Sequence, residues 1–537
     1  MESGAVQTPS GLQEPEFVRI SPSERRRSQL IFAVAICIIM IAAAWLRWSG
    51  LNSQSMWADE GFTTWFSQFS PSVQWHLLAW DNGAPLYYIA IHYWVAFWGT
   101  SEESFRALSA LFSTLSLLLV YLIAHRVWPD RIFVSFGLIL YSLSFFQIWY
   151  AKESRSYALL AFLVLTVIYL MLLCLNEPSA LRLFGLAIAL ALVLYTHNMA
   201  LFYLPGFAAF WFIYPSQMTV VMRLKTAAVV GAIALVLYLP WLSILVKQVV
   251  SVHGYFWAPK PKLTDLFGTL FTFSGLDVYV LQDLRRYLPI SRFFGLRTWT
   301  LLLLFTLVGC MVGAWWRVSS FDRRKSIALQ ACALLPIALV FVWSQMSTSV
   351  YVDRNLIGAS VLMPLIICAP IAVQVGNKRR LFQVIALLLL AATATSLSLH
   401  KQQKDNWRGT TQYLLELPER QRLVVVFQPF CQILVNYYAT GLFRSTPQPE
   451  ITGLITDFHH APAGPGLLPS LQTADPEAIL SQAMATKRYE EIDVALQLER
   501  LPAKVQAVQE FLSTHCSSVE NVTFRNLGVA RCLVRHD

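Results

Sequence analysis

Residues 29–60, QLIFAVAICIIMIAAAWLRWSGLNSQSMWADE, combine a long apolar run with a pair of carboxylates that follows it closely. The run 29–48 is long enough to cross the hydrocarbon core of a bilayer as a helix. Asp59 and Glu60 are therefore expected where the chain returns to water. We expect the chemistry of the protein at this water-facing end.

Composition places the whole chain in the membrane class. Of its 537 residues, 56% are hydrophobic and 13% are charged, and the mean hydropathy is +0.51. A soluble protein of several domains is far less apolar. The net charge of +10 would suggest a nucleic-acid partner only if the basic residues gathered on one face, but they recur in short groups between apolar runs. The sequence predicts an α-helical polytopic membrane protein that does not bind nucleic acid.

Apolar runs of span length predict about eleven transmembrane helices. Their ranges are 29–48, 104–127, 131–150, 156–175, 181–196, 199–214, 223–246, 298–316, 326–346, 354–375 and 380–399. The stretch 86–98, LYYIAIHYWVAFW, is shorter and rich in rings that favour the membrane interface, so we predict a helix lying in the membrane surface. The polar tail 1–28 is predicted to be disordered and cytoplasmic. A signal peptide is the alternative interpretation of its basic end.

The charge of the loops predicts their sides. If 86–98 does not span, all the basic loops fall on the side of the N-terminus, which the positive-inside rule assigns to the cytoplasm. These basic groups are Arg25–Arg27, His125–Arg126 with Arg131, Arg182, Arg223 with Lys225, Arg317 with Arg323–Lys325, and Lys378–Arg380. The loops 49–103 and 247–297, three short turns and everything after His400 then face outside.

The last part of the chain, 401–537, has the composition of a soluble domain. Residues 422–427 and 529–534 are predicted to be strands and 432–438 a helix, so we expect a small α/β domain. Residues 457–475 are predicted to be a loop. Cys516 and Cys532 are candidates for a disulfide if this domain faces an oxidising compartment. None of the eight cysteines shows metal-ligand spacing.

The polar residues of the outer loops suit glycosyl transfer from a lipid phosphate. Such a reaction needs a base for the incoming hydroxyl and cations for the departing phosphate. Asp59 or Glu60 can supply the base, and arginine geometry suits phosphate. Each candidate also has a structural alternative: a helix cap for the acidic pair, a surface ion pair for Glu153, a headgroup anchor for Arg354. The apolar interiors of the spans carry almost no ionisable residue, which argues against a pump or ion-coupled transporter.

Six short stretches resemble a known group of enzymes. They are 57–60 (WADE), 81–88 (DNGAPLYY), 150–157 (YAKESRSY), 195–197 (YTH), 353–356 (DRNL) and 405–409 (DNWRG). Together they resemble the polyprenyl-phosphate-sugar-dependent transferases of the GT-C fold. The nearest members are bacterial proteins of glycosyltransferase family 39, akin to protein O-mannosyltransferases and the lipid A aminoarabinose transferase. The resemblance covers about 29–400, the expected catalytic domain, and the first strand of 401–537.

The resemblance implies roles for individual residues. Asp59 is expected to be the catalytic base, with Glu60 and Glu153 as further acidic residues of the site. Independently of the resemblance, the outer-face positions of Lys152, Arg155 and Arg354 predict that these cations bind the donor phosphate. Substrate contacts are expected from Asp81, Tyr87, Tyr157, His197 and His253. The loop 247–297 is expected to close over the lipid head.

The resemblance also implies the substrates and the location. The donor is a sugar on undecaprenyl phosphate or a similar lipid, and the sugar is transferred with inversion to a lipid, glycan or protein hydroxyl. The site and the C-terminal domain are expected in the periplasm of a bacterial inner membrane. Mg²⁺ or Mn²⁺ is known for part of this fold, but no residue spacing here demands a metal. One departure is 83–85, GAP, where many relatives have His-Pro-Pro.

Two other functions stay open at the level of sequence. A transporter or lipid flippase fits the number of spans. A membrane scaffold whose C-terminal domain binds a partner fits the division at residue 400.

Overall fold

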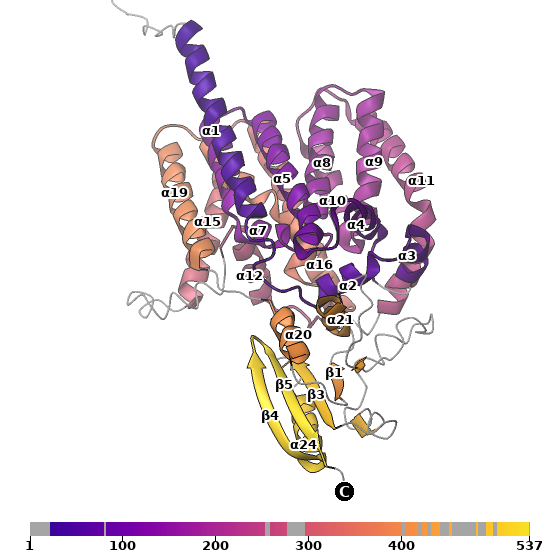
Figure 1. Cartoon of the computed structure of the whole chain (residues 1–537). Helices are drawn as coiled ribbons and strands as arrows, with labels where there is room; N and C mark the ends of the chain where they lie inside the picture. The colour runs from indigo at the N-terminus through magenta and orange to yellow at the C-terminus, as the bar shows by residue number, and fades with distance from the viewer. Residues whose placement is uncertain are drawn as a thin grey trace, which may run out of the picture.

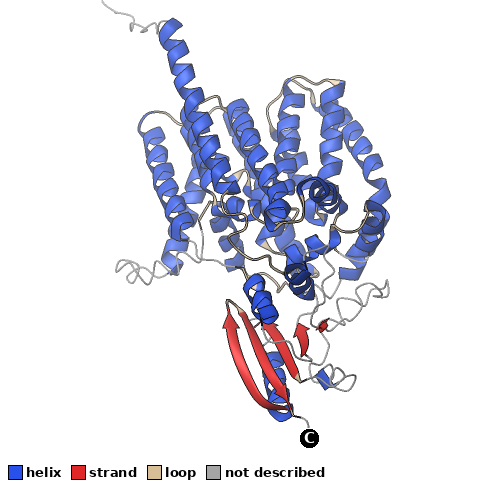
Figure 2. Ribbon diagram, viewed as in Figure 1, coloured by secondary structure: helices blue, strands red, loops and turns tan. Residues whose placement is uncertain are grey.

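A computed structural model shows a helical bundle with a small mixed-sheet domain at one end (Figures 1 and 2). It describes residues 22–79, 82–252, 258–276, 296–399, 404–416, 422–426, 431–440, 450–453, 480–481, 490–497 and 502–535. The N-terminal end of α1 and the sheet lie at opposite ends of the molecule (Figure 1). The sides of the membrane on which the N-terminus and the C-terminal domain lie stay a prediction.

The bundle consists of long apolar helices and of short helical segments that join or continue them. They are α1 (Pro22–Trp48), α5 (Glu102–Val127), α6 (Arg131–Leu143), α7 (Phe145–Ala151), α8 (Tyr157–Asn176), α9 (Ala180–Thr196), η1 (Asn198–Tyr203), α10 (Leu204–Ile213), α11 (Val220–Val252), α15 (Leu296–Gly313), α16 (Ser320–Met346), η2 (Asp353–Leu356), α17 (Ile357–Ser360), α18 (Met363–Val373) and α19 (Gly376–Leu399). Among the described residues, seven helical segments are long and apolar enough to cross a membrane, or eight if α6 and α7 form one bent span. Helices α9, η1–α10 and α15 fill the other three predicted ranges, so the count of eleven stays a prediction.

The predicted span 131–150 is broken at Ser144, where the axis bends by 54° between α6 and α7. A break leaves carbonyls of the preceding turn without their helical N–H partners. The carbonyls of Tyr141 and Ser142 instead accept hydrogen bonds from Arg47 at 3.4 and 3.3 Å. Arg47 also donates to Ser113 at 2.9 Å and is fully buried in the last turn of α1. The arginine therefore repairs the break from a neighbouring helix.

Three short helices fill the first outer loop: α2 (Ala58–Phe66), α3 (Pro71–Leu78) and α4 (Pro85–Trp98). Helix α4 lies across the bundle and is seen nearly end-on in Figure 1. Ile91 is fully buried, whereas Phe97 and Trp98 are 84% and 68% exposed. A transverse helix that buries one face and exposes aromatic residues elsewhere has the form expected of the predicted interfacial helix.

The C-terminal domain is the predicted α/β unit. Its five strands have the order β2-β1-β3-β5-β4, with β1 parallel to β2 and β3, and β5 antiparallel to β3 and β4. Its elements are α20 (Trp407–Glu416), β1 (Arg422–Val426), α21 (Gln432–Thr440), β2 (Glu450–Gly453), β3 (Glu491–Gln497), α24 (Pro502–His515), β4 (Cys516–Phe524) and β5 (Leu527–Val534). Elements β1, α21 and β5 confirm the three predicted segments, and a disulfide joins Cys516 to Cys532. The predicted loop 457–475 lies outside the described residues.

Helices α20 and α21 join this domain to the first outer loop. Tyr438 hydroxyl accepts a hydrogen bond from the Met56 N–H at 2.8 Å, and Tyr437 donates to the carbonyl of Thr100 at 3.0 Å. Arg408 forms an ion pair with Glu102 at the start of α5. These contacts fix the sheet domain over the end of the bundle that carries α2.

Candidate active site

Glu60 and Asp59 occupy the first turn of α2 but point in different directions. Successive helical residues are rotated by about 100°. As a result, Glu60 is fully buried, whereas the side chain of Asp59 is 31% exposed. The single turn after the first span thus supplies one internal and one accessible carboxylate.

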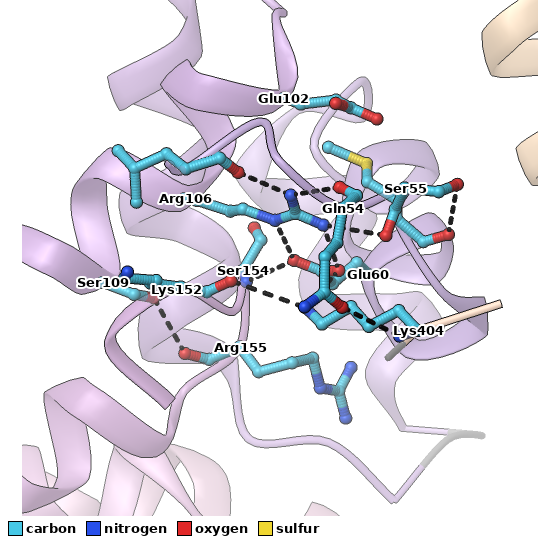
Figure 3. Close-up of polar contacts among 12 residues, drawn as sticks. Gln54, Ser55, Glu60, Glu102, Arg106, Ser109, Lys152, Ser154, Arg155 and Lys404 are labelled. Atoms are coloured by element: carbon cyan, nitrogen blue, oxygen red, sulfur yellow. Dashed lines mark hydrogen bonds and ion pairs between the residues drawn. The ribbon is translucent and has the colours of Figure 1, made fainter. Parts of the chain in front are cut away.

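Glu60 is bonded on both carboxylate oxygens by residues from other parts of the chain, which together form a polar cluster at the start of α2 (Figure 3). Its carboxylate accepts hydrogen bonds from Arg106 Nε and Nη2 at 2.7 and 2.8 Å, from the Ser154 N–H at 3.0 Å and from Lys404 Nζ at 2.8 Å. Burial favours the neutral form, but Arg106 and Lys404 outweigh it and lower the pKa of Glu60 to about 2. Glu60 is therefore charged, and both of its oxygens are occupied.

Arg106 also organises the backbone that leads into α2. Its guanidinium donates to the carbonyls of Leu51, Gln54 and Ser55 at 2.6, 2.7 and 3.1 Å (Figure 3). These carbonyls belong to a loop and have no helical partners. The Arg106–Glu60 pair thereby determines the path of the chain from α1 to Asp59.

Asp59 faces two arginines from other outer turns. Arg354 of η2 lies with Nη1 3.2 Å from Asp59 Oδ2, and its guanidinium packs over the rings of Trp57 and Tyr157. Arg155 lies with Nη1 3.5 Å from the Asp59 carbonyl and donates to the Tyr88 hydroxyl at 2.9 Å. The predicted base and two of the predicted phosphate ligands are thus brought together from three parts of the chain.

Glu153 is not the surface ion pair that its neighbours in sequence allow. It is fully buried, and neither carboxylate oxygen has a hydrogen-bond partner within the described part of the chain. Burial is the main cause that raises the pKa of Glu153 to about 7, and it outweighs the opposing fields of Lys404 and Arg354. A buried carboxyl group that titrates near neutrality is typical of functional sites.

His197, a predicted substrate contact, lies beside the two arginines of the cluster. His197 lies between α9 and η1, with its ring centroid 6.1 Å from that of Tyr157. Burial, Arg155 and Arg354 lower the pKa of His197 to about 3, so the ring is neutral. Its Nδ1 accepts from the Met199 N–H at 3.2 Å, which leaves Nε2–H as a donor.

Tyr87 and Lys152 lie at the margin of the cluster. Tyr87 is buried, and its hydroxyl is hydrogen-bonded to that of Ser109. The Ser109 hydroxyl donates to the Arg155 carbonyl at 3.2 Å, so Tyr87 is linked to the turn that carries Arg155 through one intervening side chain. The Lys152 carbonyl accepts from Lys404 at 3.4 Å. Asp81 and His253 lie outside the described residues, as does much of the loop 247–297.

Two residues of the site were missed by the sequence analysis. Arg106 lies near the start of an apolar run, and an ionisable residue inside a predicted span is a signal that could have identified it. Lys404 precedes the 405–409 stretch, and nothing in its local sequence singles it out. Only the fold brings Lys404 to Glu60.

The cluster suits an anion better than a metal ion. It contains four side-chain cations, Arg106, Arg155, Arg354 and Lys404, against three carboxylates, Asp59, Glu60 and Glu153. Both Glu60 oxygens and Asp59 Oδ2 already face cations, which leaves Asp59 Oδ1 and the buried, unpartnered oxygens of Glu153, whereas Mg²⁺ and Mn²⁺ favour several converging oxygen ligands. Within the described ranges, no three His, Cys, Asp or Glu residues are grouped to hold a metal. The described residues of the cluster therefore do not fit a divalent cation.

Comparison with known proteins adds the fold. No protein-family model and no curated protein matches the chain. Its structure resembles that of ArnT from Cupriavidus metallidurans over 94% of this chain and 98% of that one, at 11% identity and a TM-score of 0.54. ArnT bound to undecaprenyl phosphate matches with a TM-score of 0.52 and the same identity and coverage.

A second kind of enzyme shares the architecture. The oligosaccharyltransferase of Archaeoglobus fulgidus, solved with a tethered acceptor peptide, matches over 92% of this chain and 73% of that one, at 13% identity and a TM-score of 0.51. Both are GT-C glycosyltransferases. This chain has the GT-C fold. The agreement confirms the fold predicted from the six short stretches, and the acidic and basic cluster lies at the end of the GT-C bundle that the C-terminal domain covers (Figure 1).

Proposed function

We propose that this GT-C chain is an integral-membrane glycosyltransferase that moves a sugar from a polyprenyl phosphate to a hydroxyl acceptor. The observation that carries the proposal is the pairing of an accessible carboxylate with an arginine: Asp59 and Arg354 lie 3.2 Å apart in a cluster with an excess of cations. A base beside a phosphate-binding group is the minimum that such a transfer needs.

The proposed reaction is a single displacement. Asp59 takes the proton of the acceptor hydroxyl, and the oxygen forms a bond to the anomeric carbon of the sugar. The bond from that carbon to the phosphate oxygen breaks, and polyprenyl phosphate leaves with the electron pair. Attack opposite the leaving group inverts the anomeric centre. Arg155 and Arg354, with Lys152 at the margin, stabilise the charge that develops on the phosphate.

The remaining residues take supporting roles in this proposal. Glu60 positions the site rather than touching substrate, because Arg106, Lys404 and Ser154 already bond both of its oxygens. Glu153 accepts a hydrogen bond from a sugar hydroxyl through its open oxygens. Neutral His197 donates from Nε2, and Tyr157 packs beside Arg354. Asp81 and His253 keep the predicted role of substrate contacts.

The proposed donor is a sugar on undecaprenyl phosphate or a similar lipid, and the proposed acceptor is a lipid, glycan or protein hydroxyl. The protein is proposed to lie in a bacterial inner membrane with the site in the periplasm. A transporter finds less support, because the buried arginines Arg47, Arg106 and Arg223 lie near helix ends and donate to fixed protein groups.

The test uses the purified chain in liposomes with a labelled polyprenyl-phosphate sugar and an envelope extract as acceptor. Asp59→Asn keeps the size of the side chain, so we expect the thermal midpoint to change little and transfer to fall by at least about a hundredfold, as for loss of a general base. The matched control is Glu177→Gln, an acid-to-amide change at a side chain that is 72% exposed. Full transfer by Asp59→Asn would remove the base from its role. Movement of label into the lumen with the donor lipid intact would favour a transporter.

A further inference from the structure

Lys404 connects the C-terminal domain to the candidate active site. Its side chain is 6% exposed, and its ammonium group lies 2.8 Å from Glu60 Oε2 (Figure 3). The same group lies 3.4 Å from the Lys152 carbonyl and packs over the Trp149 ring. One side chain therefore touches the first outer loop and the turn after α7. The charge lies in the polar cluster although the residue belongs to the segment that leads into α20.

The backbone around Lys404 is held on both sides. The Lys404 N–H donates to Gln54 at 2.8 Å, and the Arg408 N–H donates to Ser55 at 3.0 Å, which fixes the segment to the first outer loop. On the other side, Asp405 accepts from Asn526 at 3.4 Å, in the turn between β4 and β5. The position of the ammonium group thus depends on how the C-terminal domain is docked.

The charge of Lys404 affects the protonation of Glu153. The groups that face Glu153 are Lys404, Glu60, Arg354 and Asp59, together with the hydroxyls of Tyr150 and Tyr157. Lys404 exerts the largest field that favours the charged form of Glu153, and Glu60 exerts the largest charge effect against it. Because Lys404 also pairs with Glu60, its removal would affect Glu153 twice: a cation is lost, and the charge of Glu60 is less well neutralised.

We infer that Lys404 is a positioning residue of the active site, through which the docked C-terminal domain holds Glu60 in place and sets a cation against the 152–154 turn that carries Glu153. The inference deepens the proposed function and rests on it for the role of Glu153 toward the sugar. It makes the segment 404–408 part of the site rather than a linker.

The experiment follows the protonation of Glu153 directly, by infrared titration of the intact protein in detergent. The carbonyl band of the protonated acid is assigned by its loss in Glu153→Gln. In Lys404→Met we expect the midpoint to rise by about 1 to 3 pH units, the usual effect of losing a close opposite charge. Lys404→Arg, which keeps the charge, is expected to restore most of the shift. If Lys404→Met does not fold, Lys404→Gln replaces it with the same expectation.

The matched control is a substitution at the same interface that removes no charge. Tyr438→Phe removes the hydroxyl that contacts Met56 and Glu102 but leaves every cation near Glu153 in place, so its midpoint should match the wild type. An unchanged midpoint in Lys404→Met overturns the inference. The transfer assay is a separate readout, in which the acidic limb of the pH profile should move with the midpoint. A shifted midpoint in a protein without transfer activity would uphold the role of Lys404 and refute the proposed function.

Discussion

Adjacent residues can take opposite roles when the rotation of about 100° between successive helical positions points them into different environments. Asp59 and Glu60 differ by one position, yet the buried carboxylate accepts four hydrogen bonds and the other keeps an exposed edge beside Arg354. Removing one partner of a buried ion pair typically costs about 3–5 kcal/mol, because it leaves the other charge unpaired. Glu60 therefore belongs with the groups that hold the site, and Asp59 with those that act in it.

Glu153 leads to a prediction about stability and pH. Its pKa is about 7 in the folded protein and about 4.5 as a free side chain, so the folded state binds more protons between these values. Stability should then fall as the pH rises from about 4.5 to about 7, by about 3 kcal/mol in total. Glu153→Gln removes this loss, and its thermal midpoint should exceed that of the wild type at pH 8 while the two agree near pH 4.5.

Detergent-solubilised protein at several pH values provides the measurement, with the exposed Glu177→Gln as control. The control should track the wild type at every pH. A Glu153→Gln midpoint that runs parallel to the wild type between pH 5 and pH 8 would mean that Glu153 is not a buried acid with a raised pKa.

At the scale of elements, α2 and α21 approach closely through a glycine. A Cβ added at Gly61 would lie 2.8 Å from Leu434 of α21, which is too close for carbon atoms in contact. We expect Gly61→Ala to lower the free energy of unfolding by about 1–3 kcal/mol, as overpacking does. Combining it with Leu434→Ala should cost less than the sum of the two single changes, because the cavity left by Leu434 accepts the methyl group.

Thermal unfolding of the wild type, the two single variants and the double variant gives the coupling energy between Gly61 and Leu434. Gly185→Ala in α9 is the matched control, since nothing lies within 4 Å of its added Cβ and alanine favours a helix. Strict additivity of the Gly61 and Leu434 changes would show that α21 does not pack on α2.

These elements show what the sequence can and cannot predict. Apolar length and loop charge predict the helices, the transverse α4 and the ends at which the polar loops meet, because these depend on one-dimensional patterns. The break at Ser144 and its repair by Arg47 depend on a contact between segments about 95 residues apart, which no local pattern encodes. Lys404 escapes prediction for the same reason, since its partner Glu60 lies 344 positions earlier.

At the scale of the whole molecule, the two ends of the bundle differ in chemistry. The basic loops that are predicted to share one side of the membrane also contact one another's segments. Arg379 pairs with Asp130 at 2.7 Å, Arg131 donates to the Ser28 carbonyl at 3.2 Å, and Lys325 donates to the Val127 carbonyl at 2.7 Å. The opposite end carries the Asp59–Glu60–Glu153 cluster and the disulfide domain (Figure 1). If the positive-inside rule applies, the basic end is cytoplasmic and the candidate site is outside.

Cysteine labelling of intact spheroplasts tests this orientation. In a Cys37→Ser background, Arg26→Cys places an exposed thiol at the N-terminal end of α1, and Glu520→Cys places one on β4, where the native side chain is 64% exposed. A membrane-impermeant maleimide should label Glu520→Cys at once and Arg26→Cys only after permeabilisation. The opposite pattern would put Cys516–Cys532 in the reducing cytoplasm, where such a bond rarely persists. It would also place Asp59 on the wrong side of the membrane for a periplasmic acceptor, so the proposed localisation would fail together with the orientation.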